Sequence, residues 1–360
     1  VTVHVRTTAL GTSYLEHVLV FAARLHEDVA APLPSGFHRR GFAMSLLEHQ
    51  EDDPRIPAPE TDRRHTPGAD PMPLWNESFW FPLYDPDRDI GVVVRWGLYP
   101  CWQSGSANFY VAIFRGGEAV YLANHQRAPL PSNKPGRLAL YNGLALEWLE
   151  PLRSFRLVFK EGDVGFDLTF TGMSPPFLYD SHRHGPPEVV PRHIEQGGRA
   201  QGTVTIDGRT HAFDGYAHRD HTFGGERDWN KFYRWNYFSG EFENFWFNAV
   251  RIKFDAEMDW LYVGCLFDGE RVRALDKIDI AVRTTQGGAR PTGATLELQD
   301  ETGQKHRIET GTFHGVCPVL IWNTWLKDHI VQYRMGDAIG YGILEHGYRE
   351  DERLLEFENE

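Results

Sequence analysis

The densest group of ionisable side chains in this sequence lies between residues 215 and 229, where the chain reads GYAHRDHTFGGERDW. If this segment forms a strand, His218 and Asp220 point to the same face. A carboxyl group enclosed by apolar walls has a raised pKa and keeps its proton near neutral pH. We therefore hypothesise that Asp220 is a general acid, with His218 and Tyr216 orienting Asp220 or a water molecule.

The same segment supports other interpretations. His218-Arg219-Asp220 matches the HRD of protein kinases, but Gly225 stands where a kinase has asparagine, and no glycine-rich loop, strand lysine or DFG accompanies it. His218, Asp220 and His221 have the chemistry of metal ligands. However, neighbouring strand residues diverge and HExxH is missing, so we expect no metal.

A purely structural role for Asp220 is a further alternative. Arg219 and Arg227 flank it in the sequence, and arginine–aspartate pairs often lock a turn through charge-assisted hydrogen bonds. Residues with perturbed pKa values mark functional sites only statistically. Both the catalytic and the structural interpretation therefore remain open from the sequence.

Aromatic residues supply the second candidate feature, with 11 Trp, 14 Tyr and 23 Phe among 360 residues. Trp235 and Tyr237 share one face of a predicted strand, and Trp229 precedes them. A desolvated ring attracts a cation by about 2 kcal/mol or more. An ordinary core would accept leucine and valine equally well. We expect these three rings to line a substrate pocket and to stabilise a carbocation.

Three charged residues in or next to predicted strands are further candidates for substrate binding. Glu345 lies in a glycine-flanked strand, Glu77 lies within WNESFW, and Arg95 precedes a tryptophan. The alternative for each is an ordinary solvated or paired strand residue. No nucleophile elbow, P-loop or dinucleotide fingerprint is present, so we expect no nucleotide cofactor.

Bulk composition narrows the class of protein. The formal net charge is 37 − 50 = −13, which argues against nucleic acid and anionic membranes as partners. Three distant cysteines imply no disulfide framework. No apolar run approaches the roughly 20 residues that span a bilayer. We expect a cytoplasmic protein without membrane insertion, whose partner is a hydrophobic small molecule.

Short apolar and aromatic runs separated by Gly, Asp, Asn and Pro predict an all-β protein. Asp207-Gly208 and Asp268-Gly269 predict two-residue hairpin turns, and short helices are expected only near residues 46–49 and 353–357. The predicted strands cover residues 78–83, 90–97, 108–115, 119–123, 137–140, 144–149, 154–160, 165–171, 200–206, 209–217, 234–238, 244–253, 259–267, 271–282, 294–298, 305–313, 325–335 and 340–347.

The distribution of these runs along the sequence divides the chain into an arm and two β domains. Residues 1–73 are predicted to be a disordered or extended arm, because the stretch before residue 74 is acidic and rich in proline. Residues 1–43 lack a clear period, and we expect the natural chain to begin at Met44, which the intact mass of natively expressed protein would test. The predicted domains cover 74–190 and 191–350, followed by a tail at 351–360.

The segment from Glu195-Gln196-Gly197-Gly198 to Trp229 resembles the C-terminal half of tandem lipocalin-like proteins related to carotenoid 1,2-hydratase (hydroxyneurosporene synthase) and the AttH-like group. Their usual form is close to G-x-x-x-R-D-H-S-W-G-x-R-D-W. Here Thr222 and Phe223 replace the Ser and Trp, and one extra residue precedes Arg227. The resemblance spans roughly residues 74–350, including WNESFW in the first half.

This resemblance implies two calycin-type antiparallel β domains with an apolar cavity, and neither a metal nor a nucleotide cofactor. Characterised relatives include hydratases, and similar folds act as cyclases. We expect an acid-catalysed hydratase/dehydratase or cyclase/isomerase that acts on an isoprenoid or other lipid-like substrate in a β-barrel pocket. The alternatives are a non-catalytic lipid carrier and a cyclising scaffold that works through pocket shape. The oligomeric state and the substrate's identity stay open.

Overall fold

The computed structural model describes most of the chain, and its strands confirm the all-β class that the sequence predicts. Two short 3-10 helices accompany the strands, η3 (Pro59–Asp62) and η4 (Trp229–Lys231). The short helices expected at 46–49 and 353–357 lie outside the described residues. Those described are 4–8, 53–70, 72–103, 105–132, 134–140, 142–179, 192–285 and 290–349.

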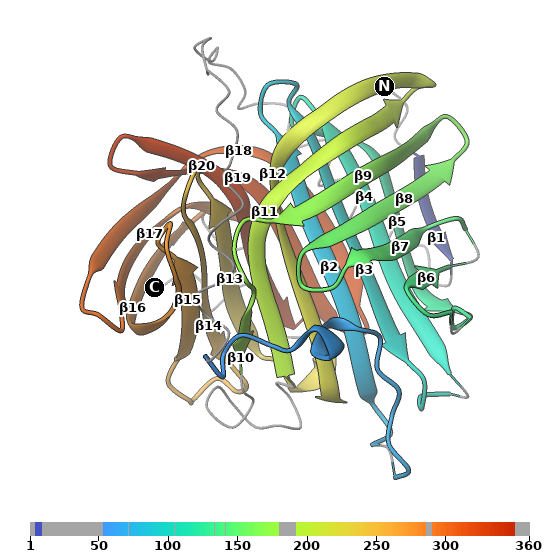
Figure 1. Cartoon of the computed structure of the whole chain (residues 1–360), viewed down its shortest axis with the longest axis horizontal. Helices are drawn as coiled ribbons and strands as arrows, with labels where there is room; N and C mark the ends of the chain where they lie inside the picture. The colour runs from blue at the N-terminus through green and yellow to red at the C-terminus, as the bar shows by residue number, and fades with distance from the viewer. Residues whose placement is uncertain are drawn as a thin grey trace.

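Twelve strands form one open sheet, called here the first sheet, which curves across one side of the molecule (Figure 1). Its order is β1–β5–β4–β3–β2–β12–β11–β9–β8–β7–β6, and β10 pairs with β11. The strands are β1 (His4–Thr8), β2 (Trp75–Asp85), β3 (Ile90–Tyr99), β4 (Ser106–Arg115), β5 (Glu118–Ala128), β6 (Arg137–Ala139), β7 (Ala145–Glu150), β8 (Ser154–Glu161), β9 (Val164–Gly172), β10 (Phe177–Tyr179), β11 (Arg192–Ile206) and β12 (Arg209–Glu226).

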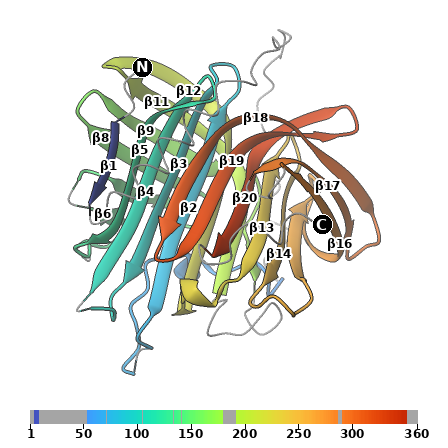
Figure 2. The ribbon, with the colours of Figure 1, turned by 180° about the vertical axis from the view of Figure 1, so that it is seen from behind.

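The remaining strands close into an antiparallel barrel in sequence order, β13 pairing with β20 (Figures 1 and 2). Closure leaves no unpaired strand edge. The barrel strands are β13 (Arg234–Glu241), β14 (Trp246–Lys253), β15 (Leu261–Phe267), β16 (Val272–Thr284), β17 (Pro291–Asp300), β18 (Lys305–Ile321), β19 (Thr324–Met335) and β20 (Ala338–Arg349).

The boundary between the two sheets falls after β12. The sequence analysis began its second domain at residue 191, but β12 pairs with β2 and β11 pairs with β9, so both strands belong to the first sheet. The barrel starts at Arg234. The division into independently folding domains remains a prediction.

The two predicted hairpin turns differ. Asp207 and Gly208 join β11 to β12 with φ angles of +52° and +71°, as a two-residue turn of the I′ type requires. The second turn is longer than predicted. Residues 268–271 separate β15 from β16, and the Asp268 carboxylate accepts hydrogen bonds from the backbone N–H groups of Glu270 and Arg271.

Side-chain alternation along the barrel strands produces two separate apolar layers. Trp235 and Tyr237 of β13 point towards the first sheet and pack with Trp80 of β2. Phe238 points the other way and packs in the barrel interior with Leu296. A third cluster fills the concave side of the first sheet. The abundant rings therefore serve both interiors and the layer between them.

Parts of the N-terminal arm contact the first sheet. The backbone of β1 pairs in parallel with β5, and Asp62 in η3 is fully buried. The sequence offered no strand signal for β1 or β10. None of the described helices is long and apolar enough to cross a membrane.

Candidate functional site

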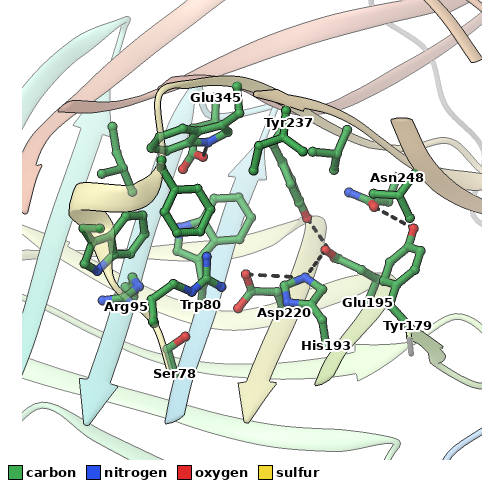
Figure 3. A pocket seen from close by; sticks show the side chains of 18 of the residues that line it. Ser78, Trp80, Arg95, Tyr179, His193, Glu195, Asp220, Tyr237, Asn248 and Glu345 are labelled. Atoms are coloured by element: carbon green, nitrogen blue, oxygen red, sulfur yellow. Dashed lines mark hydrogen bonds and ion pairs between the residues drawn. The ribbon is translucent and has the colours of Figure 1, made fainter. Parts of the chain in front are cut away.

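A cavity of about 130 Å³ lies between the first sheet and the outer face of the barrel (Figure 3). Its aromatic walls come from both sides, with Trp80 of β2 facing Trp235 and Tyr237 of β13. The sequence analysis placed the pocket inside a barrel. The barrel interior is instead filled by side chains such as Phe247 and Tyr333, and the cavity lies where two curved surfaces meet.

Three ionisable residues meet at the centre of the cavity wall (Figure 3). Glu195 of β11 lies directly opposite Asp220 of β12 in the strand register. His193 shares the face of Glu195, two residues earlier, and its Nε2 lies 2.5 Å from Glu195 Oε1 and 3.9 Å from Asp220 Oδ2. The other ring nitrogen, Nδ1, lies 2.7 Å from Thr222 Oγ1. One imidazole therefore links two carboxyl groups.

Glu195 is held as a carboxylate. Tyr237 donates its hydroxyl hydrogen to Oε2 at 2.8 Å, and Nε2 of His218 lies 2.6 Å from the same oxygen. Burial raises the pKa of Glu195, but His193 and His218 outweigh burial and lower this pKa to about 2. Glu195 is thus a fixed negative charge behind the cavity.

His218 lies behind Glu195, fully enclosed between two acidic residues. Its Nδ1 lies 2.6 Å from Oε1 of Glu241. Burial lowers the pKa of His218, but Glu241 and Glu195 raise it to about 9. Burial also raises the pKa of Glu241, to about 7. The imidazole is therefore a cation at neutral pH, and it positions Glu195.

The pKa of Asp220 is raised, whereas that of Glu195 is lowered. Burial raises the pKa of Asp220 to about 6, and the negative charge of Glu195 adds to the rise, whereas His193, Arg227 and Arg95 lower it. Its side chain is 18% exposed. Among the described residues, Oδ1 has no hydrogen-bond partner. The group is therefore a carboxyl that exchanges its proton near neutral pH and has one buried oxygen whose hydrogen-bonding capacity the described residues do not satisfy.

The cavity brings together six of the nine residues proposed from the sequence. Asp220, the three rings and two of the charged residues line it, and Trp235 donates its indole N–H to Glu345. Tyr110 and Asp328 extend this end of the site through a 3.0 Å hydrogen bond. The six residues are Asp220, Trp229, Trp235, Tyr237, Glu345 and Arg95.

Tyr216 and Glu77 do not reach the cavity. Tyr216 lies four residues from Asp220, about 13 Å along the strand, and packs under the guanidinium of Arg199 at 4.2 Å. Glu77 points to the opposite face of β2 from Trp80, because strand side chains alternate. It accepts a hydrogen bond from the backbone N–H of His65 at 2.9 Å and lies 3.0 Å from Nε2 of His221.

His193 and Glu195 are the principal residues that the sequence analysis missed as site residues. Its predicted strand began at residue 200, whereas β11 begins at Arg192, so both residues fell outside the pairing that gives them their role. Glu195 was nevertheless the first residue of the motif segment. A continuous hairpin extended backwards from Asp207-Gly208 would have placed it opposite Asp220.

The extra residue in the motif lies in a bulge of β12. The pairing of β12 with β2 shifts register between Thr222 and Gly225, and Gly224 has a φ of +82°. A bulge accommodates one added residue while the strand continues. Arg227, beyond the bulge, donates to Thr222 Oγ1 at 3.1 Å and lines the cavity.

Two groups of side chains have the composition and spacing of metal ligands. His193, Glu195 and Asp220 offer ligand atoms within 4.8 Å of one another, as do His65, Glu77 and His221. The sequence analysis considered His218, Asp220 and His221 as a set of metal ligands. His218 and His221 point to opposite faces of β12. That set cannot form.

The comparisons with known proteins agree with this architecture. Residues 58–349 match a family described as "Domain of unknown function (DUF7064)". The chain belongs to this family. No curated protein matches the chain by sequence.

Solved structures resemble this member of the family in fold. A protein described as an AttH from Nitrosomonas europaea (NE1406) superimposes with a TM-score of 0.59 at 13% identity, over 76% of this chain and 92% of that one. CghA gives 0.55 at 11% identity, over 82% and 97%. Kievitone hydratase from Nectria haematococca gives 0.49 at 12%, over 76% and 89%. The resemblance to the lipocalin-like AttH group is confirmed.

Proposed function

We propose that this chain is an acid–base enzyme of the hydratase/dehydratase or cyclase/isomerase type, acting on a hydrophobic small molecule with Asp220 as general acid. The Asp220 carboxyl carries the proposal. It faces an aromatic cavity, its Oδ1 has no hydrogen-bond partner among the described residues, and its pKa of about 6 suits a group that gives and regains a proton.

In the hydration direction, protonated Asp220 transfers its proton to one carbon of an alkene, and the other carbon becomes a cation. Water adds to that cation through oxygen and releases a proton. The Asp220 carboxylate regains a proton from this water, directly or through His193, whose Nε2 lies 3.9 Å away. The cycle leaves the protein unchanged, and its reverse removes water. Attack by a second double bond in place of water closes a ring and leaves a cation on that bond's other carbon, and a neighbouring carbon then returns a proton to the Asp220 carboxylate as a new double bond forms.

The cationic carbon fits best near β13 and β20. The rings of Trp235 and Tyr237 line the cavity there, and the Glu345 carboxyl accepts a hydrogen bond from Trp235. Rings attract cations most strongly when water is excluded. Arg95 and Arg227, which lie beside Trp229, would repel a cation placed next to that ring.

The cavity volume limits what reacts inside it. About 130 Å³ is close to the roughly 150 Å³ of an engineered cavity that admits benzene. One ring or one branched chain end fits. An isoprenoid or other lipid-like substrate would therefore place only its reacting end in the cavity.

Small molecules extracted from the purified wild type and from Asp220→Asn, compared by mass spectrometry, test this proposal. The variant should retain the substrate, whereas the wild type should retain the product. A mass difference of one water indicates hydration or dehydration, and equal masses with different retention times indicate cyclisation or isomerisation. The same molecule in both preparations would support a carrier. Turnover by Asp220→Asn of the extracted molecule would exclude Asp220 as the acid.

A further inference from the structure

Two arginines line the cavity beside the ring of Trp229. Arg95 comes from β3, and Arg227 follows the bulge of β12. Both guanidinium carbons lie near the ring of Trp229, at 5.5 Å and 5.2 Å from its centre. Figure 3 shows Arg95 on the side of the cavity away from Tyr179. Two positive charges therefore share a small, largely enclosed space.

The partners of both guanidinium groups are neutral. Arg95 Nη1 donates to the amide oxygen of Asn108 at 2.7 Å, and Arg227 Nη2 donates to Thr222 Oγ1 at 3.1 Å. Among the described residues, neither arginine has a carboxylate within ion-pair distance, and Nε of Arg227 is buried without a partner. Coulombic attraction to Asp220 offsets only part of the cost of burying the Arg227 charge. A ligand that supplies negative charge would remove this cost.

The backbone makes room for Arg95. Arg95 is only 5% exposed. A Cβ at Gly97 would lie 2.5 Å from Nη1 of Arg95 and 2.2 Å from the amide oxygen of Asn108. The absence of a side chain at this position is what allows the guanidinium to occupy its place.

We propose that Arg95 and Arg227 bind an anionic group of the substrate, a carboxylate or an enolate. A guanidinium matches the planar, two-oxygen geometry of a carboxylate, and an enolate oxygen accepts the same kind of charge-assisted hydrogen bond. This inference rests on the proposed function and adds its substrate class, an amphiphilic anion whose apolar part lies between the rings. The anion would also neutralise the charges that oppose protonation of the acid.

Benzoate and its neutral analogue benzamide provide the test, because one ring fits the cavity. Titration of the full chain, followed by tryptophan fluorescence and calorimetry, should show benzoate binding at least about tenfold more tightly, since hydrogen bonds to charged groups are worth about 1.5–3 kcal/mol. Arg95→Gln and Arg227→Gln should each remove this preference and leave benzamide affinity unchanged. Arg199→Gln is the charge-matched control outside the cavity.

Equal affinity of the wild type for benzoate and benzamide would overturn the proposal, without any variant being needed. Full benzoate preference in both folded cavity variants would do the same. Loss of preference in Arg199→Gln would show a non-specific charge effect and would also count against it. Binding is measured without turnover, so these outcomes leave the role of Asp220 to the extraction experiment.

Discussion

Arg219 of β12 forms a buried two-point ion pair with Asp62, a residue 157 positions earlier in the chain. Nη1 and Nη2 lie 2.8 Å and 2.9 Å from the two carboxylate oxygens. Arg219 also donates to Gln196 at 2.7 Å. The arm is thereby fixed to the strand that carries Asp220, on the opposite face from the cavity.

Asp62→Ala should therefore destabilise the protein by about 3–5 kcal/mol, because it leaves a buried guanidinium unpaired. Denaturant unfolding would measure this. Asp167→Ala, which breaks an ion pair with the 41%-exposed Arg156, is the matched control, and it should cost less than about 1 kcal/mol. Similar losses in the two variants would contradict the structural role of Asp62.

Asp220 should make activity depend on pH. The group must be protonated to act as an acid, and its pKa is about 6 with His193, Glu195, Arg95 and Arg227 facing it. For the free enzyme, kcat/KM should fall about tenfold per pH unit above this value. A profile that is flat from pH 5 to 8 would exclude Asp220 as the acid.

The same group should also make the stability of the fold depend on pH. Its pKa is higher in the folded protein than in the unfolded chain, so the folded state binds more protons between about pH 4 and 6, and stability falls as pH rises. Asp220→Asn should be more stable than the wild type at pH 8 by on the order of 1–3 kcal/mol. The difference should vanish near pH 3, as thermal unfolding would show. A destabilised variant at pH 8 would instead support the loop-locking role.

His218 should stabilise the protein mainly below pH 9. Its pKa is raised to about 9, so its contribution is complete below the ordinary histidine value and is lost as pH rises through about 9. His218→Gln should lower the melting temperature strongly at pH 6 and less at pH 10. His211, which is only partly buried, is the control when it is replaced in the same way. A loss that does not change with pH would mean that packing, not charge, explains the role of His218.

Gly97→Ala should weaken benzoate binding although no charge is removed, because the added Cβ displaces Arg95 or Asn108. The expected loss is about tenfold, comparable with one charge-assisted hydrogen bond. Gly68→Ala is the control, since nothing lies within 4 Å of a Cβ there. Wild-type affinity in Gly97→Ala would show that the position of Arg95 is not decisive.

Local patterns in the sequence predicted much of the fold. Period-two alternation identified the strands from residue 78 onwards, and the tight turn at Asp207-Gly208 was correct because its φ angles depend on two residues alone. Strand pairing was harder to predict from local sequence patterns. The assignment of β12 to the first sheet depends on its contact with β2, more than a hundred residues away, and β1 lacks any local signal.

Local sequence patterns also revealed some residues of the candidate site and missed others. Asp220 and the rings were found because a dense polar motif and aromatic alternation are visible along the chain. Glu195 becomes a site residue only when β11 pairs with β12, since the two carboxyl groups meet across the hairpin. The side of the strand that Glu77 faces was likewise fixed by burial against His221, which no spacing in the sequence reveals.

The cavity draws its walls from β2 near the beginning of the described chain and from β20 at its end. A ribosome that adds about 5–20 residues per second releases the first sheet well before Glu345. Until the last strand closes the barrel, the acid at position 220 is exposed to water. The proposed chemistry therefore requires that β20 has been synthesised, so a chain truncated before Glu345 would be unable to act on the substrate.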